Sequence, residues 1–125
     1  MNNRTNERLL NLAVEIGQTC DRLPNTRFGN QIPDQLVRSG TSPGPNYEEA
    51  CAAESRKDFI HKISIALKEL RESYFWLRLI VQSRLIPDDL SILVDECRQL
   101  LRIFGKSVTT ARRNDPSGKA WRHHS

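Results

Sequence analysis

The longest uninterrupted stretch of this chain constrains its fold most. Between Asn46 and Ile86 there is neither proline nor glycine. Strands seldom exceed about ten residues, so a stretch of this length predicts a helix. Asn46 as the N-cap and Glu49 three residues later match a capping box, and we predict one long helix over about 46–84. Its apolar residues follow a heptad seam: Ile60, Ile63, Leu67, Leu70, Tyr74, Leu77 and Val81.

Three further segments have apolar residues at helical spacing. The first covers about 5–23 and the last about 90–111. A shorter helix over 30–39 would have Pro33 in its first turn and Gly40 as its stop. Four helices with short connections and no competing strand pattern predict an all-α, antiparallel, up-down four-helix bundle.

The remaining segments are expected to be irregular. The loop 41–45 contains Pro43 and Pro45, and we predict no helix there. Residues 114–125 lose the helical periodicity, and we expect a disordered basic tail. The bundle would then occupy residues 1–113 as a single domain.

The sequence predicts a cytoplasmic protein without membrane contact. No apolar run is long enough to span a bilayer, and the polar first segment lacks the features of a signal peptide. The three cysteines are odd in number and far apart, so they predict no disulfide framework.

Motifs for catalysis or cofactor binding are missing from the sequence. Asp58-x-x-His61 resembles half of a di-iron motif, but the only other histidines are two residues of the tail. Cys51 has no histidine beside it, and the other two cysteines lie on apolar seams. No phosphate-binding glycine loop and no nucleophile elbow occurs. We therefore expect no enzymatic activity, no metal and no cofactor.

One segment has apolar residues on every side of its helix. In 74–81 only Arg78 is polar, and Trp76, Leu79 and Ile80 are predicted to point away from the heptad seam. These three side chains either fill a second seam of an asymmetric bundle or form a self-association surface. The sequence leaves both interpretations open.

The positive charge of the chain is concentrated near its C-terminal end. Residues 1–97 carry 12 Lys and Arg against 14 Asp and Glu, whereas residues 98–125 carry seven against one. Four basic residues of the last helix fall within one solvent-facing arc and form a row: Arg98, Arg102, Lys106 and Arg113. This row could bind the phosphates of RNA without reading base sequence, or it could complement the helix dipole and aid solubility.

Two neighbouring segments resemble a known family. They are Arg38-Ser-Gly-Thr-Ser-Pro-Gly-Pro-Asn-Tyr-Glu-Glu-Ala50 and Ala53-Glu-Ser-Arg-Lys-Asp-Phe59. They resemble the bacterial four-helix-bundle proteins first noted as reading frames inside intervening sequences of 23S rRNA genes. That family is similar in fold to the accessory variability protein of diversity-generating retroelements. The resemblance extends over roughly residues 5–113.

The resemblance implies a ring-shaped homopentamer without an established enzymatic activity. The retroelement relative is a basic partner of a reverse transcriptase and its RNA. The chain departs from the family pattern at Pro43 and Pro45. The matching positions that we interpret as loop-setting and capping residues are Arg38, Ser39, Thr41, Gly44, Asn46 and Glu49.

We therefore expect a self-associating helical bundle that binds RNA or a nucleic-acid-bound protein through its basic surface. The alternative is a homo-oligomeric scaffold or adaptor that binds another protein without nucleic acid.

Overall fold

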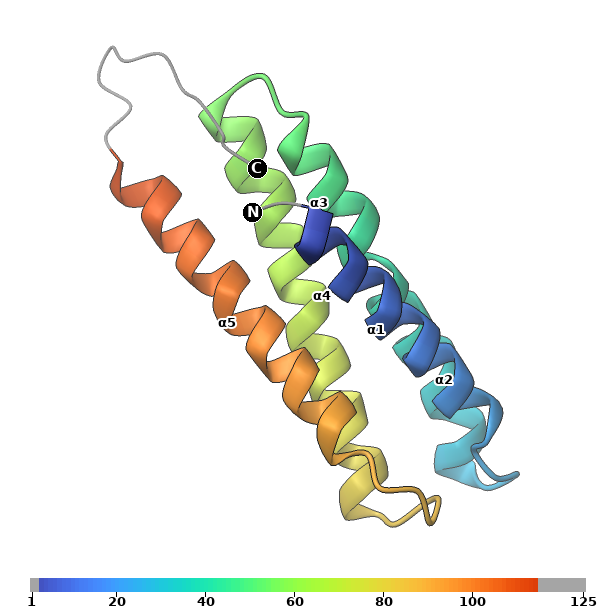
Figure 1. Cartoon of the computed structure of the whole chain (residues 1–125). Coiled ribbons are helices and arrows are strands. Elements are labelled where there is room, and N and C mark those ends of the chain that lie inside the picture. Colours follow the sequence, from blue (N-terminus) through green and yellow to red (C-terminus); the bar gives the residue numbers. More distant parts are fainter. Residues whose placement is uncertain (1–2, 115–125) are drawn as a thin grey trace.

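The computed structural model describes residues 3–114, and these residues form five helices and no strand. Helices α2 and α3 follow each other end to end, so the chain makes four antiparallel arms (Figure 1). The predicted all-α four-helix bundle is thereby confirmed. The helices are α1 (Asn3–Asp21), α2 (Arg27–Thr41), α3 (Pro43–Cys51), α4 (Arg56–Gln82) and α5 (Ser91–Arg113).

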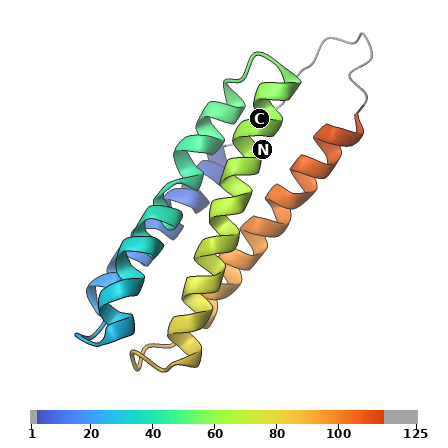
Figure 2. The ribbon, with the colours of Figure 1, turned by 180° about the vertical axis from the view of Figure 1, so that it is seen from behind.

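Helix α4 is the centre of the packing and contacts α2, α3 and α5. Seen from behind, α2 and α3 form one arm along one side of α4, and α5 lies along its other side (Figure 2). Helix α1 packs on α2 and also touches α5, where Arg8 Nη2 lies 2.7 Å from Glu96 Oε1. None of the described helices is long and apolar enough to cross a bilayer.

The predicted seams supply most of the core, which extends along the bundle. Tyr47 of α3 meets Phe104 of α5 with ring centroids 5.6 Å apart. The largest fully buried side chains come from every arm: Tyr47, Phe104, Leu9, Leu12, Ile16, Ile32, Leu36, Ile63, Leu70, Leu77, Ile80 and Leu100.

The prediction of one long helix over 46–84 is wrong. The chain reverses over residues 52–55, and α3 and α4 pack side by side in opposite directions. Ser55 is the N-cap of α4, since its Oγ accepts a hydrogen bond from the N–H of Asp58 at 3.1 Å. Because α4 has its own N-cap, it begins as a separate helix and does not continue α3. A turn of this kind requires neither proline nor glycine. With 27 residues, α4 is about 40 Å long.

The second arm also differs from its prediction, because the loop 41–45 is largely helical. Helix α3 begins at Pro43, where a missing N–H is tolerated because the first turn has no intrahelical acceptors. Helix α2 begins earlier than expected, with Thr26 as its N-cap. Pro33 therefore lies inside α2 and not in its first turn.

Gly40 was predicted to stop a helix, and this prediction is also wrong. Gly40 is buried within α2. A Cβ at this position would lie 2.6 Å from Cδ1 of Ile16 in α1. The glycine thus allows α1 and α2 to approach closely. The predicted tail over 114–125 lies outside the described residues, apart from Asn114.

Candidate nucleic-acid interface

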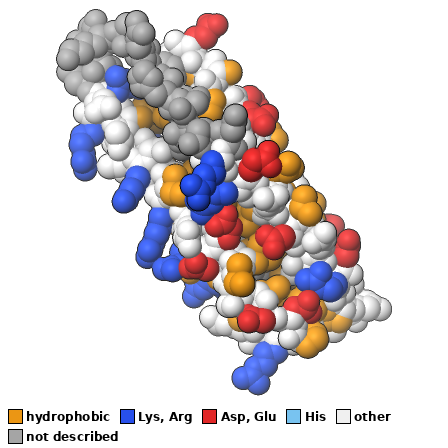
Figure 3. Space-filling view, in the orientation of Figure 1, with side chains coloured by type: hydrophobic (Ala, Val, Ile, Leu, Met, Phe, Trp, Pro, Cys, Tyr) orange, Lys and Arg blue, Asp and Glu red, His pale blue; other side chains and the backbone are white. Residues whose placement is uncertain are grey.

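The outward face of α5 brings the predicted basic residues into one row. Arg102, Lys106 and Arg113 are exposed, and Arg98 is partly exposed. Figure 3 shows Lys and Arg side chains following the edge of the molecule that α5 forms, with acidic side chains gathered toward α1. The buried face of the same helix consists of Leu93, Cys97, Leu100, Phe104, Val108 and Ala111. Packing of this apolar face therefore orients the row toward solvent.

The four cations of this row differ in their partners. Arg98 Nη2 lies 2.7 Å from Asp95 Oδ1, and this hydrogen bond lowers the pKa of Asp95. Arg102, Lys106 and Arg113 make no ion pair with any residue in the described range. No described carboxylate therefore lies within ion-pair distance of these three groups, although the charge of Arg102 contributes to the lowered pKa of Asp95.

A groove lies at the end of this row, between the end of α4 and the start of α5. Its volume is about 600 Å³, and Arg98 lines it. On its α4 side, the guanidinium carbon of Arg78 lies 5.3 Å from the centroid of the Tyr74 ring. Apolar side chains such as Ile86 and Val94 form other parts of its lining.

The three residues predicted for self-association have different environments. Ile80 is only 1% exposed and belongs to the core, so its assignment to a surface is wrong. Trp76 and Leu79 are half-buried and pack against the core. Val81, predicted in the seam, is instead 47% exposed.

Phe75 is an exposed aromatic residue that our sequence reasoning missed. It is 56% exposed, and its ring meets that of Trp76 edge to face with centroids 5.2 Å apart. The heptad pattern contained the signal, because Phe75 lies two residues from Leu77 and hence nearly opposite it on the helix. Phe75, Trp76 and Leu79 form what we call the α4 surface.

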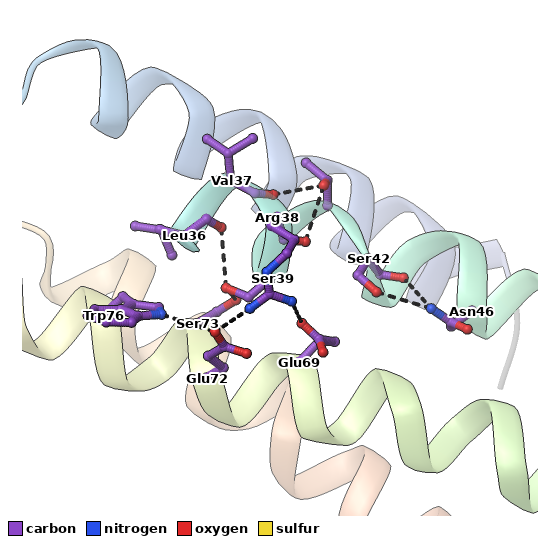
Figure 4. A network of polar contacts seen from close by, with 11 residues as sticks. Leu36, Val37, Arg38, Ser39, Ser42, Asn46, Glu69, Glu72, Ser73 and Trp76 are labelled. Atoms are coloured by element: carbon purple, nitrogen blue, oxygen red, sulfur yellow. Dashed lines mark hydrogen bonds and ion pairs between the residues drawn. The ribbon is translucent and has the colours of Figure 1, made fainter. Parts of the chain in front are cut away.

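Two of the predicted structural residues join α2 to α4. Arg38 Nη1 lies 2.7 Å from Glu69 Oε2, and Arg38 Nη2 pairs with Glu72 (Figure 4). The hydrogen bond from Arg38 lowers the pKa of Glu72. Beside them the hydroxyl oxygens of Ser39 and Ser73 lie 2.8 Å apart in the core. Arg38 and Ser39 therefore fix the second arm against α4.

The predicted capping box of Asn46 and Glu49 is not formed. Asn46 lies inside α3, where its Nδ2 donates to the backbone oxygen of Ser42 at 3.0 Å. Glu49 pairs with Lys62 of α4, with Oε1 and Nζ 2.7 Å apart. Asn46 therefore stabilises α3 from within the helix, and Glu49 joins α3 to α4.

The two remaining structural positions flank the junction of α2 and α3. Thr41 Oγ1 donates to the carbonyl oxygen of Val37 at 2.7 Å, in the last turn of α2. Gly44 lies in the first turn of α3, where a Cβ would be 4.0 Å from that of Leu9. This is ordinary contact, so the packing at Gly44 does not require glycine.

The described residues contain no group of three or more His, Cys, Asp and Glu side chains able to hold a metal ion. His123 and His124 lie outside the described residues. Burial raises the pKa of the Cys97 thiol to about 12 and that of Cys20 to about 11. Both thiols are therefore protonated at neutral pH.

Comparisons with known proteins agree with the resemblance in the sequence. The model of the 23S rRNA-intervening sequence protein family matches residues 2–106. A crystal structure of a protein of unknown function from the S23 ribosomal protein family of Bacteroides thetaiotaomicron is similar, with 31% sequence identity and a TM-score of 0.74. The match covers 83% of this chain and 97% of that one. A comparison with curated proteins found no match.

Proposed function

Because this chain belongs to the 23S rRNA-intervening sequence protein family, and the similar protein from Bacteroides thetaiotaomicron is of unknown function, we propose its function from its own surface. We propose a non-enzymatic bundle that binds the backbone of RNA through the outward face of α5. We further propose that copies of the chain associate through the α4 surface.

One observation supports RNA binding above the others: Arg102, Lys106 and Arg113 are exposed on one face without an ion pair to a described residue. Arg102 and Lys106 lie one helix turn apart, about 6 Å along the axis. Several phosphates of one strand can therefore be contacted at once. Phosphate contacts of this kind position a nucleic acid without reading its sequence.

The competing explanation, complementarity to the helix dipole, accounts for only part of this row. The dipole effect fades within the last turn of a helix. Arg113 lies in that turn. Lys106 and Arg102 lie about two and three turns before the end of α5. The dipole therefore does not account for Lys106 and Arg102, and the titration below distinguishes an external anion from a role in solubility alone.

A titration with labelled single-stranded RNA at low salt tests the proposal. The variant Arg102→Gln/Lys106→Gln should bind about tenfold more weakly than the unaltered chain. The matched control is Arg27→Gln/Lys68→Gln, which removes the same charge from exposed positions of α2 and α4. Equal weakening by both variants would mean that only net charge matters. An absence of binding would favour the alternative, a scaffold or adaptor that binds another protein.

The proposal of self-association is supported by the exposed ring of Phe75 beside Trp76. Exposed apolar patches of this kind often mark interfaces. Light scattering should give a multiple of 14.4 kDa, and five copies is the number that the family resemblance implies. Phe75→Glu should reduce the mass to that of one chain while the helical circular dichroism stays unchanged. The control is Ile92→Glu on α5, another exposed apolar residue. A single-chain mass for the unaltered protein would contradict the proposal.

A further inference from the structure

We propose that the groove between α4 and α5 receives an unpaired base of the RNA strand that lies along α5. This inference deepens the proposed function and rests on it. It follows from two unpaired arginines and a cation–π contact in the lining of the groove, and from the size of the groove and its position at the end of the basic row.

Three aspartates and three arginines line the groove, so its charge depends on which of these side chains are paired. All three carboxylates already have partners within the protein. Asp88 Oδ2 lies 2.9 Å from Nε of Arg22, Asp89 accepts a hydrogen bond from the N–H of Ser91 at 2.9 Å, and Asp95 accepts from Arg98.

Two of the three arginines have no such partner. Arg78 and Arg84 make no ion pair with a residue of the described range. Asp89 keeps its negative charge, since its partner is a neutral N–H. The unpaired charges of the groove are therefore two positive and one negative, and the positive excess suits a ligand that carries a phosphate.

The groove also offers surfaces on which a base can stack. The guanidinium carbon of Arg78 lies 5.3 Å from the centroid of the Tyr74 ring, a cation–π contact within the lining of the groove. Unpaired RNA bases commonly stack on aromatic rings or on arginine planes. A base in the groove could therefore stack on either group.

Arg84 also lines the groove, and its backbone has a φ of 52°. This left-handed conformation closes α4 as a Schellman turn, because the N–H of Leu85 donates to the carbonyl oxygen of Ile80 at 3.3 Å and that of Arg84 donates to Val81 at 3.1 Å. Glycine or asparagine is usual at such a position, since a side chain disfavours it. The turn here places an arginine without an ion pair to a described residue in the lining of the groove.

The groove has the size and the position that a base at the end of the row requires. Its volume of about 600 Å³ is within the range of small-molecule sites. Arg98 belongs both to the basic row and to the lining of the groove. A strand that contacts Arg102 and Lys106 can therefore continue into the groove. A base can enter only if it is unpaired, so the chain should prefer single strands to duplexes.

The test uses the full-length chain and RNA of one sequence, either single-stranded with one 2-aminopurine or annealed to its complement. The unaltered chain should bind the single strand at least about fivefold more tightly, and binding should quench the 2-aminopurine fluorescence. Arg78→Gln should abolish the quenching and most of this preference. Lys68→Gln, also on α4 but outside the groove, should change neither.

A second variant separates a binding role from a structural one. Arg84→Gly relieves the backbone strain, so its urea midpoint should rise, while its preference for single strands should fall. A variant that is more stable and yet selects less cannot be explained by damage to the fold. An unchanged preference in both Arg78→Gln and Arg84→Gly would overturn the inference.

Two further outcomes separate the groove from the row. Equal affinity for single strands and duplexes, with both weakened by Arg102→Gln/Lys106→Gln, would show that the row binds RNA and the groove does not. Binding of adenosine monophosphate that needs Arg78 but not Arg102 and Lys106 would overturn the assignment to a strand and indicate a free nucleotide. Failure of the double variant to weaken any RNA binding would refute the proposed function itself.

Discussion

The close approach of α1 to α2 at Gly40 can be tested by adding a single methyl group. In Gly40→Ala the new Cβ would lie 2.6 Å from Cδ1 and 3.0 Å from Cγ2 of Ile16. Two effects oppose each other: alanine favours a helix by about 1 kcal/mol over glycine, whereas overpacking a core costs about 1–3 kcal/mol. The net expectation is a loss of about 1 kcal/mol in the free energy of unfolding.

A double-mutant cycle isolates the steric part of this effect. Ile16→Val removes the Cδ1 atom and alone should cost about 1 kcal/mol. Combined with Gly40→Ala, it relieves the closest overlap, and the double variant should be about 1 kcal/mol more stable than the sum of the two changes predicts. Urea denaturation followed by circular dichroism gives each free energy.

Gly17 provides the control, because it lies in α1 and nothing is within 4 Å of a Cβ built there. Gly17→Ala should therefore stabilise the chain by up to about 1 kcal/mol through helix propensity alone. If Gly40→Ala stabilises the chain in the same way, or if its effect adds to that of Ile16→Val, the close packing of α1 on α2 is refuted.

Three other properties of the chain should respond to defined changes. Ser55→Ala removes the cap of α4 and should lower the free energy of unfolding by about 1 kcal/mol in urea, while Asn46→Ala, which removes no cap, should cost less than half as much. The Cys97 thiol keeps its proton more tightly in the fold, with a pKa of about 12 instead of 9.0. The contribution of this thiol to stability should therefore be constant below about pH 9 and fall above it by up to about 1.4 kcal/mol per pH unit, and Cys97→Ala should reduce this alkaline loss. Arg84→Gly should raise the free energy of unfolding by about 1 kcal/mol, because glycine adopts the left-handed backbone without a steric cost; no increase would contradict this reasoning.

Apolar periodicity predicted the bundle and most of its core correctly. Leu9, Leu12 and Ile16 of α1 are buried as their spacing indicated, and so are Cys97 and Phe104 of α5. This succeeded because a helix that buries one stripe must repeat apolar residues at its own period. The number of arms followed from the same pattern.

The boundaries were predicted less well, because proline and glycine were given too much weight as helix breakers. Pro43 lies at the start of α3, and Gly40 lies inside α2. The turn before α4 contains neither residue, and its signal was the Ser-x-x-Asp pattern at Ser55 and Asp58. That pattern lies inside a stretch without proline or glycine, which fits one continuous helix as well as two helices joined by a turn. Only the packing of α3 on α4 distinguishes the two arrangements.

Part of the candidate site could also be predicted from the sequence. Helical geometry placed Arg102 and Lys106 on one exposed face, because residues four apart share a side of the helix. The pairing of charges could not be predicted, since Arg22 and Asp88 are distant in sequence. The groove and the strained backbone of Arg84 depend on how α4 turns into α5, which periodicity does not describe.

The salt dependence of RNA binding tests the central claim most directly. For single strands the slope of log K against log salt is about −0.7 for each phosphate contact. If Arg102 and Lys106 each contact a phosphate, Arg102→Gln/Lys106→Gln should have a slope shallower by about 1.4, and Arg27→Gln/Lys68→Gln should keep the original slope. The same slope for all three proteins would contradict the claim that the outward face of α5 binds RNA.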